Sequence, residues 1–150
     1  MKMSGKRILV PVNGTPTSDH AFRWACQLAR QTRAELYAVH VSEIPMEFPL
    51  NTEFVQEDNK GEAILARIEA IAGEEKCKVD AQLLQARHAG PALVLEAEDR
   101  QMEMIILGIP YRHRLGHCVL GTTSTYLLEH APCQVIFWRE RISTPALSRV

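Results

Sequence analysis

Residues 108–124 read GIPYRHRLGHCVLGTTS and directly follow the apolar run MIIL at 104–107. A short buried strand is therefore expected to run into a polar loop that carries glycines near both ends. The loop closes with Gly121, Thr122, Thr123 and Ser124, and small hydroxyl residues ahead of an apolar stretch are typical of a helix start. The first N–H groups of a helix lack internal partners, and the helix dipole is positive there. This stretch predicts a site for an anion such as phosphate.

Outward from this stretch, short apolar runs alternate with amphipathic stretches along the chain. Strands are expected at 8–12, 35–41, 79–83, 104–107 and 134–138 (Gln134 to Trp138), because these runs are short and apolar. Helices are expected at about 17–32, around 64–72, from Gly90-Pro91 with Pro91 as the first helical residue, and at 122–130. Residues 44–59 carry no pattern and are expected to form an irregular connection. The alternation predicts an α/β fold with a parallel sheet covered by helices on both faces.

The fractions of hydrophobic and charged residues are those of an ordinary globular protein. The chain has 150 residues, of which 46% are hydrophobic and 23% charged, and a formal net charge of -1. That charge offers no overall attraction to nucleic acid, and no apolar run approaches the roughly 20 residues that span a bilayer. With no secretory signal in the sequence, a cytoplasmic protein is expected, with no nucleic-acid or membrane partner. The four cysteines (Cys26, Cys77, Cys118, Cys133) form no C-x-x-C pair and are interpreted as reduced thiols.

The ligand site is expected at one edge of this sheet. In open parallel sheets, ligands bind beyond the carboxyl ends of the strands, near the point where the strand order reverses. Three loops leave such ends, at 13–15, at 41–43 and from 108 onward. They can converge on one cleft.

Several segments in order resemble the universal stress protein family. They are ILVPVNGTPTSDHAFRWACQLA at 8–29, AVHV at 38–41, GPALVLEAEDRQMEMIILG at 90–108 and HAPCQVIFW at 130–138. The resemblance extends over about 6–139 and leaves 140–150 as a tail. It implies one domain over 1–150, with a Rossmann-like open five-stranded parallel sheet of order 3-2-1-4-5 and helices on both faces.

Nucleotide-binding members of that family carry G-x2-G-x9-G-[ST] after the fourth strand. The spacing is kept here by Gly108, Tyr111, Gly121 and Thr122, but Tyr111 replaces the second glycine. A tyrosine there either strains and occludes the loop, or swings out and leaves the other backbone donors in place. Asn13 stands where those members usually carry an acidic residue, so it brings no charge to hold a divalent cation, and metal-dependent hydrolysis is not favoured.

The resemblance implies an adenine-nucleotide binding protein of the stress response, taking ATP or AMP, with Mg2+ able to accompany the nucleotide. Val41 would offer backbone groups to the adenine edge. No catalytic residue is expected, and no enzyme activity beyond at most a weak ATPase. The nucleotide-binding residues that it implies are Pro11, Val12, Asn13, Gly14, Thr15, Val41, Gly108, Tyr111, Gly121, Thr122, Thr123 and Ser124.

A homodimer through the strand from Gln134 to Trp138 is expected, because this apolar run would lie at the sheet edge without a protecting lysine, proline or glycine. The family resemblance points the same way. A nucleotide-independent, dimeric interaction or regulatory protein of the same fold stays open as the alternative function. His113, His117 and Cys118 are interpreted as a solvated basic loop rather than a metal site, and His40 as a structural histidine.

Overall fold

The computed structural model describes residues 6–111 and 113–141. Along the chain the elements are β1 (Arg7–Pro11), α1 (Pro16–Thr32), β2 (Glu35–Glu43), α2 (Val55–Glu74), β3 (Asp80–Ala86), α3 (Ala89–Asp99), β4 (Met104–Ile109), β5 (His113–Arg114), β6 (His117–Cys118), α4 (Thr122–His130) and β7 (Gln134–Arg139).

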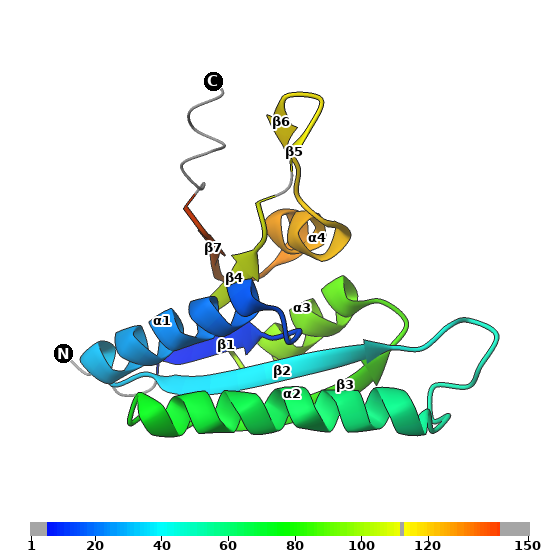
Figure 1. Ribbon diagram of the computed structural model, residues 1–150, viewed down its shortest axis with the longest axis horizontal. Coiled ribbons are helices and arrows are strands. Elements are labelled where there is room, and N and C mark those ends of the chain that lie inside the picture. Colours follow the sequence, from blue (N-terminus) through cyan, green and yellow to red (C-terminus); the bar gives the residue numbers. More distant parts are fainter. Residues whose placement is uncertain (1–5, 112, 142–150) are drawn as a thin grey trace.

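Five of the strands form one sheet in the order β3-β2-β1-β4-β7. Every neighbouring pair is parallel, with Ile8 beside Leu36 and Ile105 beside Val135. This confirms the expected strand order and the α/β class. In Figure 1, α1 and α2 lie on one side of the sheet, and α3 and α4 lie on the other.

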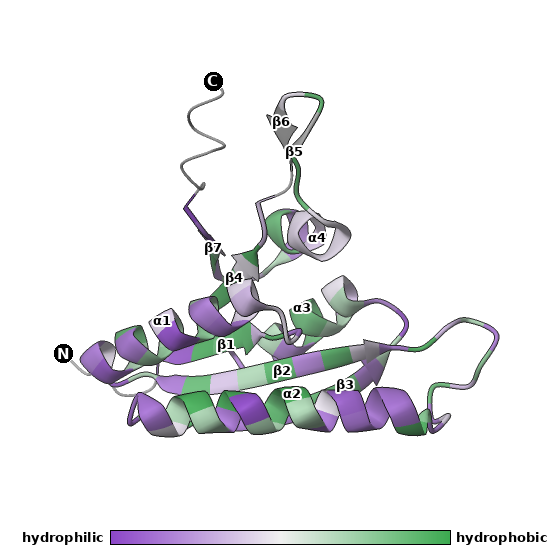
Figure 2. Cartoon of the chain, in the orientation of Figure 1, coloured by the Kyte–Doolittle hydropathy of each residue, from purple (hydrophilic) through white to green (hydrophobic). Residues whose placement is uncertain are grey.

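Alternate strand residues point into two separate cores, as the pleat of a strand requires. The core under α1 and α2 includes Ile8, Val10, Phe22, Ile68 and Ile106. The core under α3 and α4 includes Leu9, Val39, Leu93, Ile105 and Leu127. In Figure 2, hydrophobic and hydrophilic segments alternate along α2, as in a helix with one face on a core. β1 and β4 at the centre of the sheet are buried on both faces, which fixes the strand ends that carry the site.

Two boundaries differ from expectation. The connection expected over 44–59 is shorter, because α2 begins at Val55. Phe48 packs edge-to-face on Phe54 just ahead of the helix, and Glu57 and Asp58 in its first turn suit the positive end of the dipole. α3 begins at Ala89, so Pro91 is its third residue rather than its first. Pro91 still lies in the first turn of α3, where backbone N–H groups have no partner within the helix, so its missing N–H breaks no helical hydrogen bond.

The loop after β4 is not wholly irregular. β5 and β6 form a two-stranded antiparallel hairpin, which projects away from the sheet in Figure 1. Leu115 and Gly116 at its tip both have positive φ angles, +52° and +81°, as a tight hairpin turn requires. Within the described residues, no helix has the length and apolar character needed to cross a membrane.

Candidate functional site

A cleft of about 580 Å³ opens at the carboxyl ends of β1, β2 and β4. Its walls come from the ends of these strands, from the first residues of α3 and α4, and from Ser18 of α1. β1 and β4 are adjacent and are the strands from which the order runs in opposite directions, so the cleft lies at the reversal point.

Nine of the twelve residues expected to bind nucleotide line this one cleft. They are Pro11, Val12, Asn13, Val41, Gly108, Gly121, Thr122, Thr123 and Ser124. Gly14, Thr15 and Tyr111 are not among the lining residues. The structure therefore brings together segments that lie more than a hundred positions apart in the sequence.

Gly14 and Thr15 shape the loop after β1 instead of lining the cleft. The Asn13 side-chain oxygen accepts hydrogen bonds from the Thr15 N–H at 3.1 Å and from its hydroxyl at 2.7 Å. The Thr15 hydroxyl caps α1 by accepting from the Ser18 N–H at 3.2 Å, and Gly14 takes a positive φ of +83°. The Asn13 N–H donates to the Ser18 hydroxyl at 3.1 Å. The loop is thus held by its own hydrogen bonds, with the Asn13 oxygen already engaged.

Gly108 has a packing reason to be glycine, besides its place in the cleft. A Cβ there would lie 2.9 Å from the Thr17 carbonyl oxygen and 2.9 Å from the Ala21 Cβ. α1 therefore crosses β4 so closely that no side chain fits between them. This contact fixes the start of α1, and with it Ser18, against the end of β4.

Two helices begin at the cleft, and they differ in what occupies their first N–H groups. At α3, the Glu43 carboxylate at the end of β2 accepts a hydrogen bond from the Ala89 N–H at 2.8 Å. At α4, whose N-cap is Gly121, no side chain among the described residues caps the helix. The positive end of α3 is therefore already paired with a negative charge, whereas the first N–H groups of α4 are available to a ligand.

Sequence reasoning placed Glu43 in a loop at the cleft without giving it a role, and it missed the lining residues at the start of α3, namely His88, Ala89, Gly90 and Pro91. The start of α3 follows the carboxyl end of β3, and this position in a parallel sheet was the available signal. Gly90 also allows α3 to meet α4, because a Cβ there would lie 2.8 Å from the Cβ of Tyr126.

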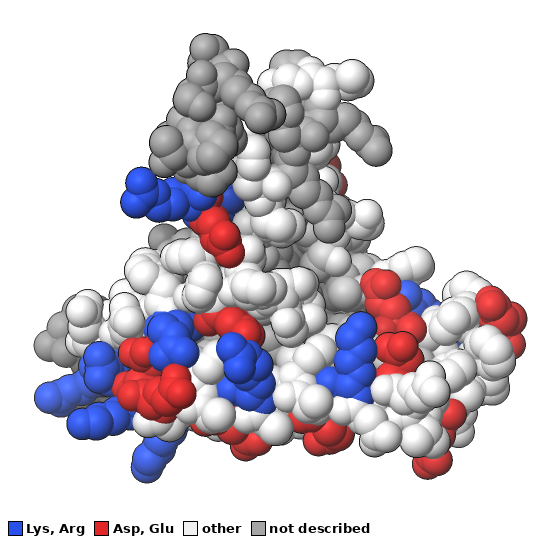
Figure 3. Space-filling view, in the orientation of Figure 1, with Lys and Arg blue, Asp and Glu red and all other residues white. Residues whose placement is uncertain are grey.

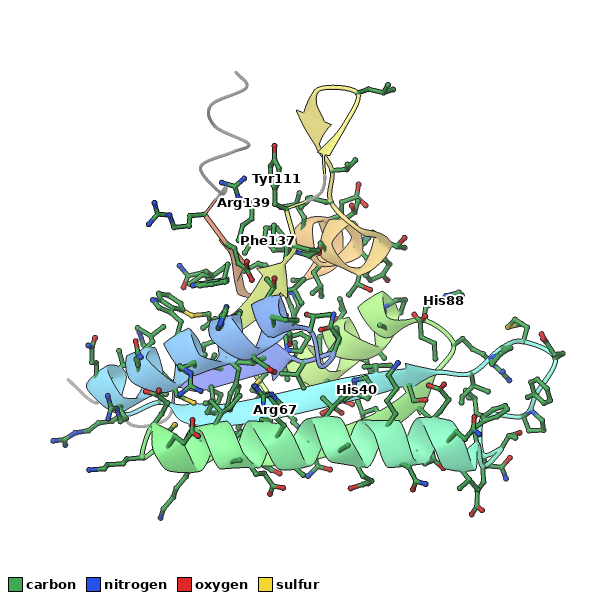
Figure 4. All side chains as sticks on the ribbon, viewed as in Figure 1. His40, Arg67, His88, Tyr111, Phe137 and Arg139 are labelled. Carbon is green, nitrogen blue, oxygen red and sulfur yellow. The ribbon has the colours of Figure 1, made fainter. Side chains whose placement is uncertain are left out.

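His40 was expected to be structural, and its ring Nδ1 lies 2.8 Å from the Val12 carbonyl oxygen. A carbonyl oxygen can only accept, so Nδ1 carries the proton of this bond. His40 is also among the residues that line the cleft. His40 thus ties β2 to the end of β1 beside the site (Figure 4).

Tyr111 points away from the cleft. The guanidinium carbon of Arg139 lies 5.2 Å from the centre of its ring, within the range of a cation–π contact. Figure 4 shows the two side chains together, apart from His40 and His88. Tyr111 is also absent from the positive-φ residues. Of the two alternatives for this position, the swung-out ring without backbone strain is the one observed.

The side chains of Arg112, His113, Arg114, His117 and Cys118 lie outside the described residues, so the basic-loop interpretation concerns groups that the structure does not describe. Within the part that it does describe, no three His, Cys, Asp or Glu side chains cluster in a way that could hold a metal ion.

Comparison with known proteins places this fold and cleft in context. The model of the universal stress protein family matches residues 5–139. A universal stress protein of Methanocaldococcus jannaschii is 26% identical over 139 residues, covering 87% of this chain and 80% of that protein. One from Thermus aquaticus is 32% identical over 140 residues, covering 89% of this chain and 98% of that protein.

Solved structures share the fold. The universal stress protein from Archaeoglobus fulgidus in complex with dAMP superposes with a TM-score of 0.70 at 19% identity, covering 88% of this chain and 96% of that one. An Arabidopsis thaliana family protein with AMP bound gives 0.65 at 16% identity, covering 94% and 99%. Because the family model spans nearly the whole chain and the sheet has the same topology as these structures, this chain belongs to the universal stress protein family.

Proposed function

We propose that the cleft binds an adenine nucleotide, ATP or AMP, with its phosphates on the first N–H groups of α4. The observation that carries the proposal is the start of α4, at Gly121 to Ser124, which no described side chain caps and which lies inside a cleft of about 580 Å³ at the reversal point of the sheet. Unpartnered N–H groups and the positive dipole end hold phosphate without a dedicated cation.

The other end of the cleft suits a base. The ends of β1 and β2 supply Val12, Val39 and Val41, whose apolar side chains and backbone groups line the wall. Two proteins of the same fold are solved with dAMP and with AMP, which supports an adenine nucleotide as the ligand here. Asn13 already donates to Ser18 and accepts from Thr15 and carries no charge, so Mg2+ would have to come with the nucleotide's own phosphates.

We place this binding protein in the stress response, as the family resemblance implies, in the cytoplasm, without an enzymatic role beyond at most a weak ATPase. The experiment is a thermal-shift and calorimetric titration with ATP, ADP and AMP, each with and without Mg2+. A ligand at about a hundredfold over its Kd should stabilise the fold by about 2.7 kcal/mol. No shift and no heat with any of the three at millimolar concentration would rule out nucleotide binding.

That negative result would favour the second candidate, a dimeric interaction or regulatory protein that needs no nucleotide. The observation on its side is the engaged Asn13 oxygen, which already accepts two hydrogen bonds and brings no negative charge. The swung-out Tyr111 does not favour it, since the ring leaves the cleft open.

We also propose a homodimer through β7. Within the described residues β7 pairs only with β4, so its other edge presents unpaired N–H and C=O groups. Val135 to Trp138 are half-buried in the single chain, and a two-fold partner strand would cover them. Light scattering after size exclusion should give a dimer, and Ile136→Pro should give monomer or aggregate. A monodisperse wild-type monomer at tens of micromolar, where an interface of about 1,600 Å² should persist, would contradict this assembly.

A further inference from the structure

A second groove lies at the opposite, amino end of the sheet, and it contains a cysteine. This groove of about 460 Å³ is lined by Cys77, by Glu35 and Asp80, and by four cationic side chains, Arg30, Arg33, Lys76 and Lys78. Four cations against two carboxylates make it net positive. Figure 3 shows Lys and Arg at the end of the α1/α2 face where both helices finish, with Asp and Glu beside them.

Cys77 does not stand alone, because a second cysteine lies beneath it. Cys26 is fully buried on the inner side of α1, and Cys77 packs against the core cluster to which Cys26 belongs. Both are free thiols. The pKa of each thiol is affected by the other.

Ion pairs on either side hold the two cysteine-bearing segments together. Arg23 of α1 pairs with Glu75 at 2.7 Å and with Glu74 at 3.0 Å, and Gln27 also donates to Glu75, at 3.4 Å. These α1 residues lie on either side of Cys26 in the sequence, and Glu75 lies two positions before Cys77. The backbone N–H of Cys77 donates to the Ala72 carbonyl at 2.9 Å. The two segments are therefore held together by contacts outside the sulfurs, and the Cys77 Sγ itself donates to the Lys78 carbonyl at 3.5 Å.

Cys77 and Cys26 differ in solvent exposure and in thiol pKa, and these differences decide which thiol reacts first. Burial raises the pKa of both, and for Cys26 the neighbouring Cys77 raises it further. For Cys77 the neighbouring Cys26 thiol and the Arg30 guanidinium oppose the rise of the pKa, while Glu75 adds to it. Cys77 also lines the groove, whereas Cys26 is closed off from solvent. Cys77 is thus the thiol that a reagent meets first.

We propose that Cys77 and Cys26 form a site of thiol–disulfide exchange, at which an anionic disulfide of the glutathione class thiolates Cys77 and Cys26 resolves the product. The Cys77 thiolate attacks one sulfur of the disulfide, forms a mixed disulfide and releases one glutathione thiolate. Cys26 then attacks the Cys77 sulfur, and its proton passes to the sulfur of the departing glutathione, which leaves as the second thiol. Two cysteine thiols are oxidised to one disulfide, and the reagent is reduced to two thiols. The groove's net positive charge attracts the reagent's carboxylates.

The test uses the variant Cys118→Ala/Cys133→Ala, which keeps only Cys26 and Cys77. The folded, reduced protein is incubated with oxidised glutathione at about pH 8.5, where more thiolate is present, and its intact mass is measured. The expected product is about 2 Da lighter than the reduced chain and carries no glutathione. Digestion should avoid trypsin, because Lys76 and Lys78 flank Cys77 and leave a dipeptide.

Two further variants in the same background resolve the order of events. Cys26→Ala should retain one glutathione on Cys77, and Cys77→Ala should stay unmodified under conditions that give complete reaction of the two-thiol protein. The proposal is overturned if the two-thiol protein retains glutathione, forms disulfide-linked dimers, or stays reduced while its urea-unfolded form reacts. The outcome does not depend on nucleotide binding, because the groove and the cleft lie at opposite ends of the sheet.

Discussion

The starts of α3 and α4 face the same cleft, yet they differ in what the described side chains do at their first N–H groups. At α3 the Glu43 carboxylate, at the end of β2, already accepts from the Ala89 N–H, whereas at α4 no side chain in the described part of the chain forms a cap. A helix start is therefore not an anion site by itself, since the protein can satisfy it internally. The difference directs the phosphates to α4 and leaves a fixed negative charge on the other wall.

The largest effect on nucleotide affinity should come from placing a carboxylate at the start of α4, as Glu43 is placed at the start of α3. Thr123→Asp places a carboxylate in the first turn of α4, where it can pair with the free N–H groups and repel phosphate. Calorimetry should show AMP and ATP binding weakened about 10- to 100-fold, while the helix gains about 0.3–1 kcal/mol. The matched control Thr123→Asn, without the charge, should stay within about threefold of wild type. Equal loss in both variants would mean that charge is not the cause.

The contact between α3 and α4 should give the next largest effect, on the free energy of unfolding. In Gly90→Ala the new Cβ would lie 2.8 Å from Tyr126 on α4, so the two helix starts must move apart. Urea unfolding should show a loss of about 1–3 kcal/mol, the usual cost of overpacking. Gly73→Ala, where nothing lies within 4 Å of the added Cβ, is the control and should be neutral or stabilising by up to about 1 kcal/mol. Unchanged stability of Gly90→Ala would show that this contact is loose.

Glu43→Gln should change ATP affinity less than Thr123→Asp does, and in the opposite direction. The amide still accepts from Ala89, but the negative charge facing the bound phosphates is gone. ATP should bind about two- to fivefold tighter at low salt, with adenosine unchanged, because only the phosphates are repelled. Glu62→Gln, on the exposed side of α2, is the control and should leave both affinities unchanged. Weaker ATP binding in Glu43→Gln would place the phosphates elsewhere.

The local pattern of the sequence was enough to predict most of the fold. Residues 122–130 were predicted as a helix and form α4, and each expected sheet strand is present within two or three residues of its bounds. The start of α2 was missed because residues 44–59, with two prolines and several acids, carry no periodic pattern. In the structure Gly61 lies inside the helix and packs close to β3, since a Cβ there would lie 2.8 Å from a terminal methyl group of Leu83.

The parts of the site that were missed depend on contacts between distant residues. Glu43 caps a helix that begins 46 positions later, and no local pattern marks such a pairing. The orientation of Tyr111 likewise depends on Arg139 of β7. Sequence motifs indicated where a ligand could bind, but not which of the two helix starts was already occupied.

The most direct test of the central claim is to record backbone amide signals by NMR during a titration with AMP. The largest shifts are predicted at Thr122, Thr123 and Ser124, with the Ala89 N–H nearly unchanged because Glu43 holds it. A titration with adenosine should leave the α4 amides almost unmoved while signals from Val39 to Val41 still respond. Shifts centred on Ala89 and Gly90, with α4 silent, would contradict the assignment of the phosphate site to α4.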